Sequence, residues 1–176
     1  CSEIILRPYQ FCNLSEVVVR ESDTLATLKE KVRLATILGT FQSTLTNFKY
    51  LRKIWQNNTE EERLLGVSLT GIMDNTLTAT ANGTLETALE VLRLESVNTN
   101  AAIAKQLNVP QSTAVTCVKP SGTVSQLVDA ASGIHARHNP YYIRTVRGDN
   151  KDPLTQFLVA QGIPAEPDVM KPDSTT

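Results

Sequence analysis

The most informative segment of this sequence runs Thr-Ala-Val-Thr-Cys-Val-Lys-Pro-Ser-Gly-Thr-Val-Ser, residues 113–125. Its first half, 113–118, is apolar and rich in β-branched residues, and it predicts a strand. Its second half is a turn that contains glycine, and we expect a short helix from Val124 to Ala131 after it. A strand that leads through such a turn into a helix is the repeating unit of α/β folds. The segment therefore predicts an α/β architecture.

The flanking sequence continues this alternation of strands and helices. Short β-branched or apolar runs predict strands at 16–20, 64–72 and 141–147. N-cap oxygens at 22–24 open a helix of about 20 residues, with Leu25, Leu28, Val32, Ala35 and Leu38 at helical spacing. A second long helix starts at 82–84 and ends at Val109-Pro110, with Leu85, Leu89, Leu92 and Val97 on one stripe. Asp152-Pro153 starts a third helix, which runs to Gly162. We expect the strands to be mostly parallel.

Composition and charge narrow the class of protein. A chain of 176 residues with 41% hydrophobic and 20% charged residues suits one globular domain, or a large piece of one. A net charge of -1 gives no electrostatic case for nucleic acid or for an anionic membrane as partner. No apolar run approaches the roughly 18 residues of a membrane span. The odd count of 3 cysteines favours a reducing compartment, and we expect a cytoplasmic protein.

Both ends of the chain read as interior sequence. It begins at Cys1 without a methionine, and residues 163–176 are polar and rich in proline. We therefore expect an internal fragment with a truncated tail at 163–176, inactive in isolation. A first-position cysteine also matches the residue directly after an excised intein, a hypothesis that the upstream gene sequence would test.

The first chemical constellation joins Cys1, Glu3 and Cys12. Two thiols this close in sequence, on a segment rich in turns, can meet in space, and a neighbouring carboxylate can move a proton beside a sulfur-centred reaction. The alternative is a pair of buried structural cysteines with a solvated glutamate. Cys117 lies in an apolar run, and we expect it in the core.

The second constellation is the turn between the predicted strand and helix. A glycine turn that opens a helix presents unpaired backbone N–H groups and the positive end of the helix dipole, and hydroxyl side chains add further donors. This combination suits a phosphate group, although a plain helix cap is the commoner explanation. The candidate phosphate-binding residues are Pro120, Ser121, Gly122, Thr123, Val124 and Ser125.

The third constellation contains His135 and His138, which could join Cys1 and Cys12 in a zinc site. The spacing of the two cysteines is long for a zinc knuckle, and no Cys-x-x-Cys motif is present. Solvated or hydrogen-bonding histidines are more typical of such a pattern, and Arg137 between them is a candidate contact for an anion. A zinc-stabilised, non-catalytic module that binds a phosphate or a nucleotide therefore stays open as the alternative function.

Taken in chain order, these segments resemble the ribonucleotide reductases. The resemblance is carried by residues 1–4, 12–17, 119–125 and 132–144. The short separation of Cys1 from Cys12 is similar to the monomeric, adenosylcobalamin-dependent (class II) ribonucleoside-triphosphate reductases. Diphosphate reductases of other radical classes space these cysteines more widely.

The resemblance implies a fold and roles for individual residues. The fold is a ten-stranded α/β barrel like that of the glycyl-radical enzymes, with 1–12 as the end of its finger loop and 113–131 as a strand, phosphate loop and helix. Cys1 matches the cysteine that becomes a thiyl radical, Glu3 the carboxylate beside it, and Cys12 one of two cysteines that reduce the substrate. The other reducing cysteine is expected in a segment that precedes this chain.

The same resemblance implies the cofactor and the partners. Adenosylcobalamin is the expected cofactor, and a ribonucleoside triphosphate is the expected substrate, reduced for DNA synthesis. A thioredoxin-like protein is the expected reductant, and an allosteric deoxynucleotide is expected to bind outside this chain. None of these roles requires a metal site among the cysteines and histidines of this sequence.

Overall fold

The computed structural model describes residues 3–176, so Cys1 and Ser2 lie outside the described residues. The chain divides into two compact units, the first ending at Arg137 and the second comprising His138–Thr176. No helix among the described residues is long and apolar enough to cross a membrane.

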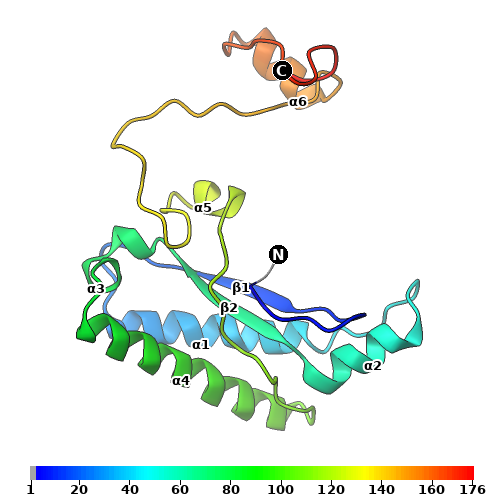
Figure 1. Ribbon diagram of the computed structural model, residues 1–176, viewed down its shortest axis with the longest axis vertical. Coiled ribbons are helices and arrows are strands. Elements are labelled where there is room, and N and C mark those ends of the chain that lie inside the picture. The colour runs from blue at the N-terminus through cyan, green and yellow to red at the C-terminus, as the bar shows by residue number, and fades with distance from the viewer. Residues whose placement is uncertain (1–2) are drawn as a thin grey trace. The chain divides into compact units, whose positions relative to one another are not determined.

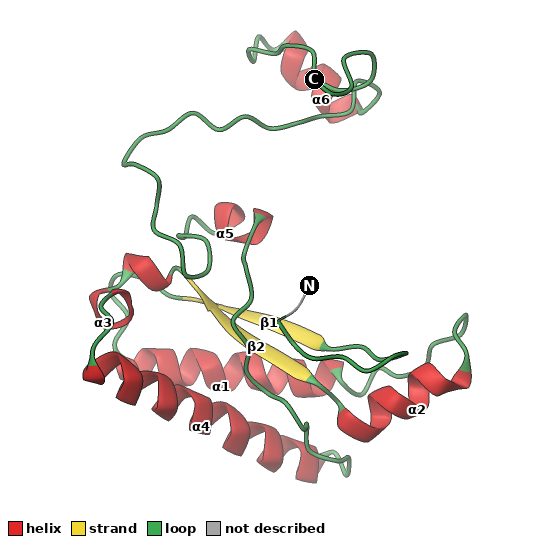
Figure 2. Cartoon of the chain, in the orientation of Figure 1, coloured by secondary structure: helices red, strands yellow, loops and turns green. Residues whose placement is uncertain are grey.

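Two parallel strands form the sheet of the first unit. Strand β1 (Asn13–Val18) pairs with β2 (Leu65–Thr70), in a register that sets Asn13 opposite Leu65 and Val18 opposite Thr70. Helices α1 (Leu25–Gln42) and α2 (Lys53–Glu62) connect the strands along the chain, as a parallel pair requires (Figures 1 and 2). The α/β class predicted from the sequence is confirmed. The described residues contain this two-stranded sheet, and the ten-stranded barrel therefore stays a proposal.

The predicted strand at 113–118 lies along β2 but is shortened to a single parallel bridge between Val67 and Thr116. The Val67 N–H donates to the Val115 carbonyl at 2.8 Å, and the Cys117 N–H donates to the Val67 carbonyl at 3.0 Å. The Leu65 N–H donates to the Ala114 carbonyl, so two successive carbonyls face β2. A regular parallel ladder cannot accommodate this, which is why the strand is interrupted.

Helices α1 and α4 (Gly83–Gln106) pack side by side against one face of the sheet (Figure 1). Their predicted starts are confirmed, because the Thr24 and Asn82 side chains accept hydrogen bonds from backbone N–H groups of the first turns. The buried core lies between these helices and the sheet. Its members are Val17, Val19, Leu28, Val32, Ala35, Leu65, Val67, Leu92 and Val115.

The apolar stripe predicted for the second long helix is only partly correct. Leu92 is buried, but Leu89 and Val97 are exposed, as is Leu38 of α1. The buried stripe of α4 consists instead of Ala88, Leu92, Ser96, Asn100 and Ala104. These side chains are mostly small or polar, and Asn100 donates a hydrogen bond to the Thr40 hydroxyl of α1 at 3.0 Å. The two helices therefore meet through a polar seam that hydrophobic spacing does not reveal.

Other elements differ from the sequence prediction. The sequence did not predict α2, yet this helix runs through the asparagine pair at 57–58, because Asn58 donates to the Pro8 and Tyr9 carbonyls instead of competing with its own helix. After β2 come a 3₁₀ turn, η1 (Ile72–Asp74), and α3 (Thr76–Ala79). Helix α5 (Thr123–Leu127) is shorter than predicted, and Asp129 beyond it adopts a left-handed φ of 47°.

The second unit contains one helix, α6 (Pro153–Ala160), whose predicted start is confirmed by the Asp152 side chain, which accepts a hydrogen bond from the Leu154 N–H. The strand predicted at 141–147 is wrong. These residues are exposed and form no strand, although their alternation suits one. A strand needs a neighbouring strand for its backbone groups, and among residues 3–176 no β-ladder or β-bridge includes this segment.

Candidate active site

The two faces of the sheet have different surroundings. Side chains of odd-numbered strand residues such as Val17 and Leu65 point toward the helices. The even-numbered residues point to the other side, because side chains alternate along a strand. We call this second side the loop face. It consists of Leu14, Glu16 and Val18 on β1 and of Gly66, Ser68 and Thr70 on β2.

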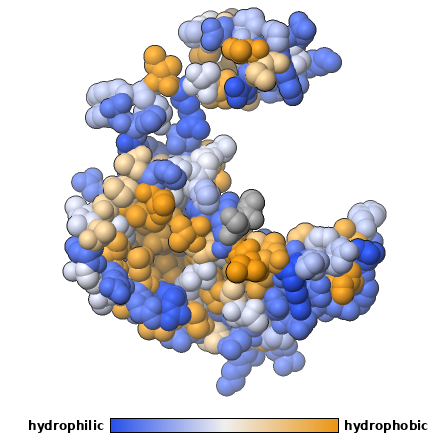
Figure 3. Space-filling model, viewed as in Figure 1, coloured by the Kyte–Doolittle hydropathy of each residue, from blue (hydrophilic) through white to orange (hydrophobic). Residues whose placement is uncertain are grey.

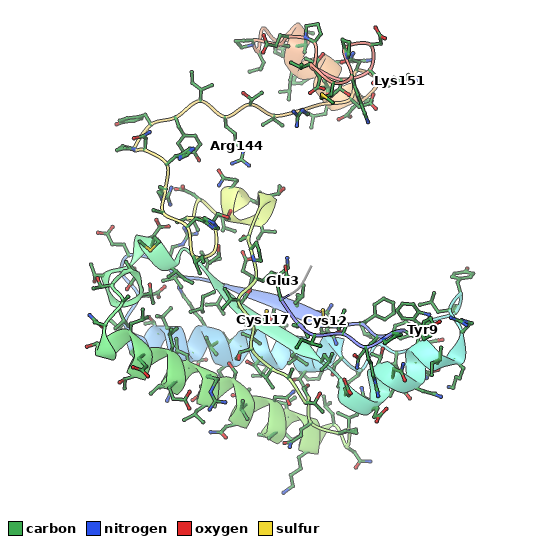
Figure 4. All side chains as sticks on the ribbon, in the orientation of Figure 1. Glu3, Tyr9, Cys12, Cys117, Arg144 and Lys151 are labelled. Carbon is green, nitrogen blue, oxygen red and sulfur yellow. The ribbon has the colours of Figure 1, made fainter. Side chains whose placement is uncertain are left out.

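Two of the sequence-predicted site residues, Glu3 and Cys12, lie at this loop face, and Cys117 lies there with them (Figure 4). The pKa of Cys12 lies above its ordinary value. Burial and the charge of Glu3 raise this pKa, whereas a hydrogen bond from the Cys12 backbone N–H and the charge of Lys119 lower it. Burial also raises the pKa of Cys117, as do the charges of Cys12 and Glu3. Both thiols are therefore kept protonated near neutral pH. Cys1 lies outside the described residues.

The expectation that Cys117 is a core residue is wrong. Its sulfur lies 3.0 Å from the position that a Cβ at Gly66 would occupy, on the loop face. Leu14 Cδ2 and Ile4 Cδ1 approach the same position to 2.5 Å and 2.7 Å. The missing side chain at Gly66 thus lets three segments meet over β2: the residues next to Glu3, the strand that follows Cys12, and the residues before Lys119.

Cys12 and Cys117 are both free thiols. Strand β2 lies between the segments that carry them. Strands two positions apart in a sheet are about 9.5 Å apart, whereas a disulfide needs Cα atoms within about 7 Å. A direct disulfide between them is therefore not expected without backbone movement.

Helix α2 holds the segment between Glu3 and Cys12 in place. Arg7 donates to Glu61 at 2.5 Å, and the buried Gln10 donates to Glu62 at 2.5 Å. Phe11 stacks on Trp55 of the same helix, with ring centroids 4.7 Å apart. This helix, which the sequence did not predict, therefore fixes the approach of the 3–12 segment to the sheet.

The candidate phosphate loop has few free hydroxyl groups. Ser121 is buried and donates to the Glu16 carboxylate at 2.9 Å, and the buried Ser125 donates to the Gly122 carbonyl at 2.7 Å. Thr123 is exposed, and its hydroxyl makes no hydrogen bond within residues 3–176. A phosphate at this loop would therefore meet backbone N–H groups and Thr123 first. The helix after the loop has five residues, so its dipole adds little.

The segment after this loop is clamped to the end of β2. The buried Thr70 hydroxyl donates to the Ala131 carbonyl at 3.0 Å and accepts from the Gly133 N–H at 2.8 Å. Asp74 accepts hydrogen bonds from the Ala131 N–H at 2.7 Å and from Arg137 at 2.9 Å. Arg137, a candidate contact for an anion on sequence grounds, is instead paired within the protein, since it also binds Asp129 at 2.8 Å.

Asp74 and Arg137 each shift the pKa of the other in the direction that favours the charged form. Burial acts to raise the pKa of Asp74, but hydrogen bonds from Arg137 and from the Ala131 N–H outweigh it, and the pKa lies below its ordinary value. Hydrogen bonds to Asp74 and Asp129 raise the pKa of Arg137. Neither aspartate was singled out in the sequence; Asp74 lies 63 residues from Arg137, a contact that no local pattern reveals.

The alternative zinc site gains no support. Among residues 3–176, no group of three or more His, Cys, Asp or Glu side chains is placed to hold a metal ion. A cavity of about 740 Å³ does exist in the first unit, but it is apolar and lined mainly by α4, β2 and residues 116–118 (Figure 3). Glu3, Cys12 and the 120–125 loop are not part of its lining.

Comparison with known proteins identifies relatives of the chain, although no protein-family model matches it. The chain is 30% identical over 200 residues to the adenosylcobalamin-dependent ribonucleoside-triphosphate reductase of Lactobacillus delbrueckii subsp. bulgaricus, covering 99% of this chain and 27% of the relative. It is 29% identical over 181 residues to the reductase of the same name from Euglena gracilis, covering 99% and 24%. A crystal structure of a B12-dependent (class II) ribonucleotide reductase matches with a TM-score of 0.73 and 25% identity, over 98% of this chain and 27% of that one.

In sequence and in fold, the chain is thus related to the ribonucleotide reductases. Its relatives are more particularly the adenosylcobalamin-dependent ribonucleoside-triphosphate reductases, so the resemblance predicted from the sequence is confirmed. The chain spans about a quarter of the length of the curated relatives that it matches.

Proposed function

We propose that the protein containing this chain reduces ribonucleoside triphosphates to deoxyribonucleotides by a thiyl-radical mechanism. The supporting observation is that Cys12 lies close enough to Glu3 and to Lys119, the residue before the phosphate loop, for the charges of both to act on its thiol. Glu3 and Cys12 are also among the residues that carry the resemblance in sequence. Reduction of a nucleotide needs a thiol near the ribose and a loop that binds the phosphates on the same face of the sheet. Cys12 and the 120–125 loop both lie on the loop face.

The proposed chemistry divides among three groups. A thiyl radical at Cys1 removes the hydrogen at the ribose 3′ carbon and returns it at the end. Glu3 accepts the proton of the 3′ hydroxyl, which assists departure of the 2′ hydroxyl as water. Cys12 and a second cysteine donate two electrons and two protons and become a disulfide. An external dithiol, supplied by a thioredoxin-like protein, then reduces that disulfide by thiol exchange.

The raised pKa of Cys12 suits this role. A reducing cysteine that must deliver hydrogen as well as electrons is best held as a thiol, and burial together with the charge of Glu3 keeps it so. Lys119 acts in the opposite direction and eases formation of a thiolate when the disulfide must be reduced again.

Adenosylcobalamin is the proposed cofactor because the relatives are named as dependent on it. When bound, it supplies the radical that Cys1 takes up. The cavity of about 740 Å³ is lined by Cys117 but not by Glu3 or Cys12, so its lining does not by itself bring a cofactor to those two residues. The cofactor is therefore proposed to bind to other parts of the protein, and no step is assigned to this chain's residues toward it.

The remaining assignments extend the same proposal. Residues 1–12 form the end of a finger loop, 113–131 form a strand, phosphate loop and helix, and 163–176 continue into a tail within a ten-stranded catalytic barrel. An allosteric deoxynucleotide binds outside this chain. The odd cysteine count favours the cytoplasm.

The experiment is a nucleotide reduction assay on the full-length protein, with adenosylcobalamin and a dithiol. Cys1→Ser is expected to abolish deoxynucleotide formation and leave substrate binding intact. Cys12→Ser is expected to stop turnover at the reduction step. Thr123→Val should weaken nucleotide binding by about 1–3 kcal/mol if one buried hydrogen bond is lost. Deoxynucleotide formation that persists in Cys1→Ser would refute the thiyl assignment.

A further inference from the structure

Glu16 lies near the middle of the loop face of β1. It stands opposite Ser68 in the strand register, but the buried Ser68 donates its own hydroxyl to the Ser15 carbonyl at 3.3 Å. The partner of Glu16 is instead Ser121, which lies 105 residues further along the chain and donates to Glu16 Oε1 at 2.9 Å. Within residues 3–176, no other hydrogen bond joins β1 to residues 120–125.

Ser121 is the centre of a small hydrogen-bond network. Its hydroxyl has a single proton, and it uses that proton to donate a hydrogen bond to Glu16. Its carbonyl accepts a hydrogen bond from the Ser132 hydroxyl, and at 3.3 Å it shares the single Ser125 hydroxyl proton with the nearer Gly122 carbonyl at 2.7 Å. Ser121 is only 4% exposed. One residue thus connects the strand, the first turn of α5 and the segment after α5.

We infer that Glu16 is a positioning residue, which through Ser121 sets where the backbone N–H groups of residues 122–124 stand relative to Cys12. Cys12 and Glu16 are four residues apart along one extended segment, which is about 13 Å at 3.3 Å per residue. The strand therefore fixes the spacing between the reducing thiol and the anchor of the loop. This inference rests on the proposed function, which gives that spacing its purpose.

The charge of Glu16 supports a positioning role over a direct one. An ionised carboxylate accepts hydrogen bonds only and repels a phosphate, so it is a poor ligand for the anion that the loop is proposed to bind. It is a strong acceptor for a buried hydroxyl. A glutamine could accept the same hydrogen bond without the charge, so two substitutions separate geometry from charge.

The experiment compares the full chain in five forms: wild type, Glu16→Gln, Glu16→Ala, Ser121→Ala and, as a control for loss of one negative charge, Glu166→Ala in the second unit. Hydrogen exchange is measured at the amides of 121–125 and 132–133, and binding of inorganic tripolyphosphate is measured by calorimetry. Glu16→Ala and Ser121→Ala should speed exchange at these amides about tenfold, as expected from loss of one hydrogen bond, without changing α1 and α4. Glu16→Gln and Glu166→Ala should exchange like the wild type.

Tripolyphosphate binding tests whether the position of the loop, and not the charge of Glu16, controls the affinity for phosphate. Glu16→Ala should weaken tripolyphosphate binding about tenfold, while Glu16→Gln should bind at least as tightly as the wild type. Unchanged loop exchange in Glu16→Ala would overturn the inference, as would equal acceleration by Glu16→Gln and Glu16→Ala. If the variants show the expected exchange pattern but the wild type binds no tripolyphosphate, the positioning stands and the phosphate role of the loop fails.

Discussion

Gly71 ends β2 in a conformation that other residues adopt only under strain, and Gly71→Ala tests how firmly the site is attached to the sheet. Its φ is 76°, and a Cβ at this position would stand 2.5 Å from the carbonyl oxygen of Val19. A left-handed conformation costs a non-glycine residue about 1–2 kcal/mol, and forcing a backbone atom aside costs about 1–3 kcal/mol more. We expect Gly71→Ala to lower the free energy of unfolding by about 2–5 kcal/mol.

Two glycines of the same unit are matched controls. Gly133 also has a positive φ, 55°, but its nearest neighbour, the Lys119 carbonyl, would be at an ordinary 3.4 Å from a Cβ. Gly83, at the first position of α4, has no atom within 4 Å of that position. Gly133→Ala should therefore lose only the conformational part, about 1–2 kcal/mol, and Gly83→Ala should gain up to about 1 kcal/mol.

Urea unfolding followed by far-UV circular dichroism measures all three variants, with the midpoint read at constant slope. The Gly71 N–H donates to the Ala131 carbonyl at 2.7 Å, so amide exchange at 129–133 should rise in Gly71→Ala as well. Equal losses in Gly71→Ala and Gly133→Ala would refute the reasoning, because the close approach to Val19 would then carry no free energy.

Contacts of Asp74, Glu3 and Asn100 lead to three further predictions. Asp74→Asn should lower the free energy of unfolding by about 1 kcal/mol near pH 7, since its bonds with Arg137 are partly exposed. The pKa of Asp74 is lowered in the folded state, so this stabilisation is complete above the ordinary carboxyl pKa and is lost as the pH falls through the folded value. Urea unfolding of wild type and variant should therefore begin to converge below the ordinary carboxyl pKa and coincide only below the folded pKa. Glu3→Gln should lower the pKa of the Cys12 thiol and so speed its alkylation by iodoacetamide at pH 8, followed by mass spectrometry, and an unchanged rate would separate Glu3 from Cys12. Asn100→Ala should cost about 2–3 kcal/mol in thermal unfolding, because Asn100 is 2% exposed and bonds both Thr40 and Ser112, whereas Asn98→Ala on the exposed side of α4 should change little.

Local signals predicted the helix starts well and the helix contacts less well. Caps at Thr24, Asn82 and Asp152 depend on residues within three positions, which the sequence displays directly. The seam between α1 and α4 depends on Asn100 meeting Thr40, 60 residues away. Nothing in a stripe of leucines announces such a contact, and tertiary hydrogen bonding prevailed over hydrophobic spacing.

Helix α2 and residues 141–147 show opposite failures of the same kind. The sequence of α2 is polar, with a pair of asparagines in its middle, and does not favour a helix by itself. The helix is stabilised by tertiary contacts, in which Asn58 and Trp55 bind the segment before Cys12. Residues 141–147 have the alternation of a strand, yet alternation describes only the faces that a strand would bury. Both outcomes depend on which neighbours are present.

The site was predictable where it is local and was missed where it is not. Glu3 and Cys12 could be selected by residue type and spacing, and alternation along the strand then places Leu14 and Glu16 on the same face as Cys12, so Glu16 was within reach of the sequence argument. What the sequence does not contain is its contact with Ser121, 105 residues away, which changes the meaning of both residues. The sequence assigns Ser121 to a phosphate, whereas its hydroxyl already donates its only hydrogen bond to the Glu16 carboxylate. Because that bond leaves the backbone N–H groups and the Thr123 hydroxyl as the remaining donors, any selectivity of the loop for phosphate must depend largely on backbone geometry, and backbone geometry here depends on Glu16, Thr70 and Asp74.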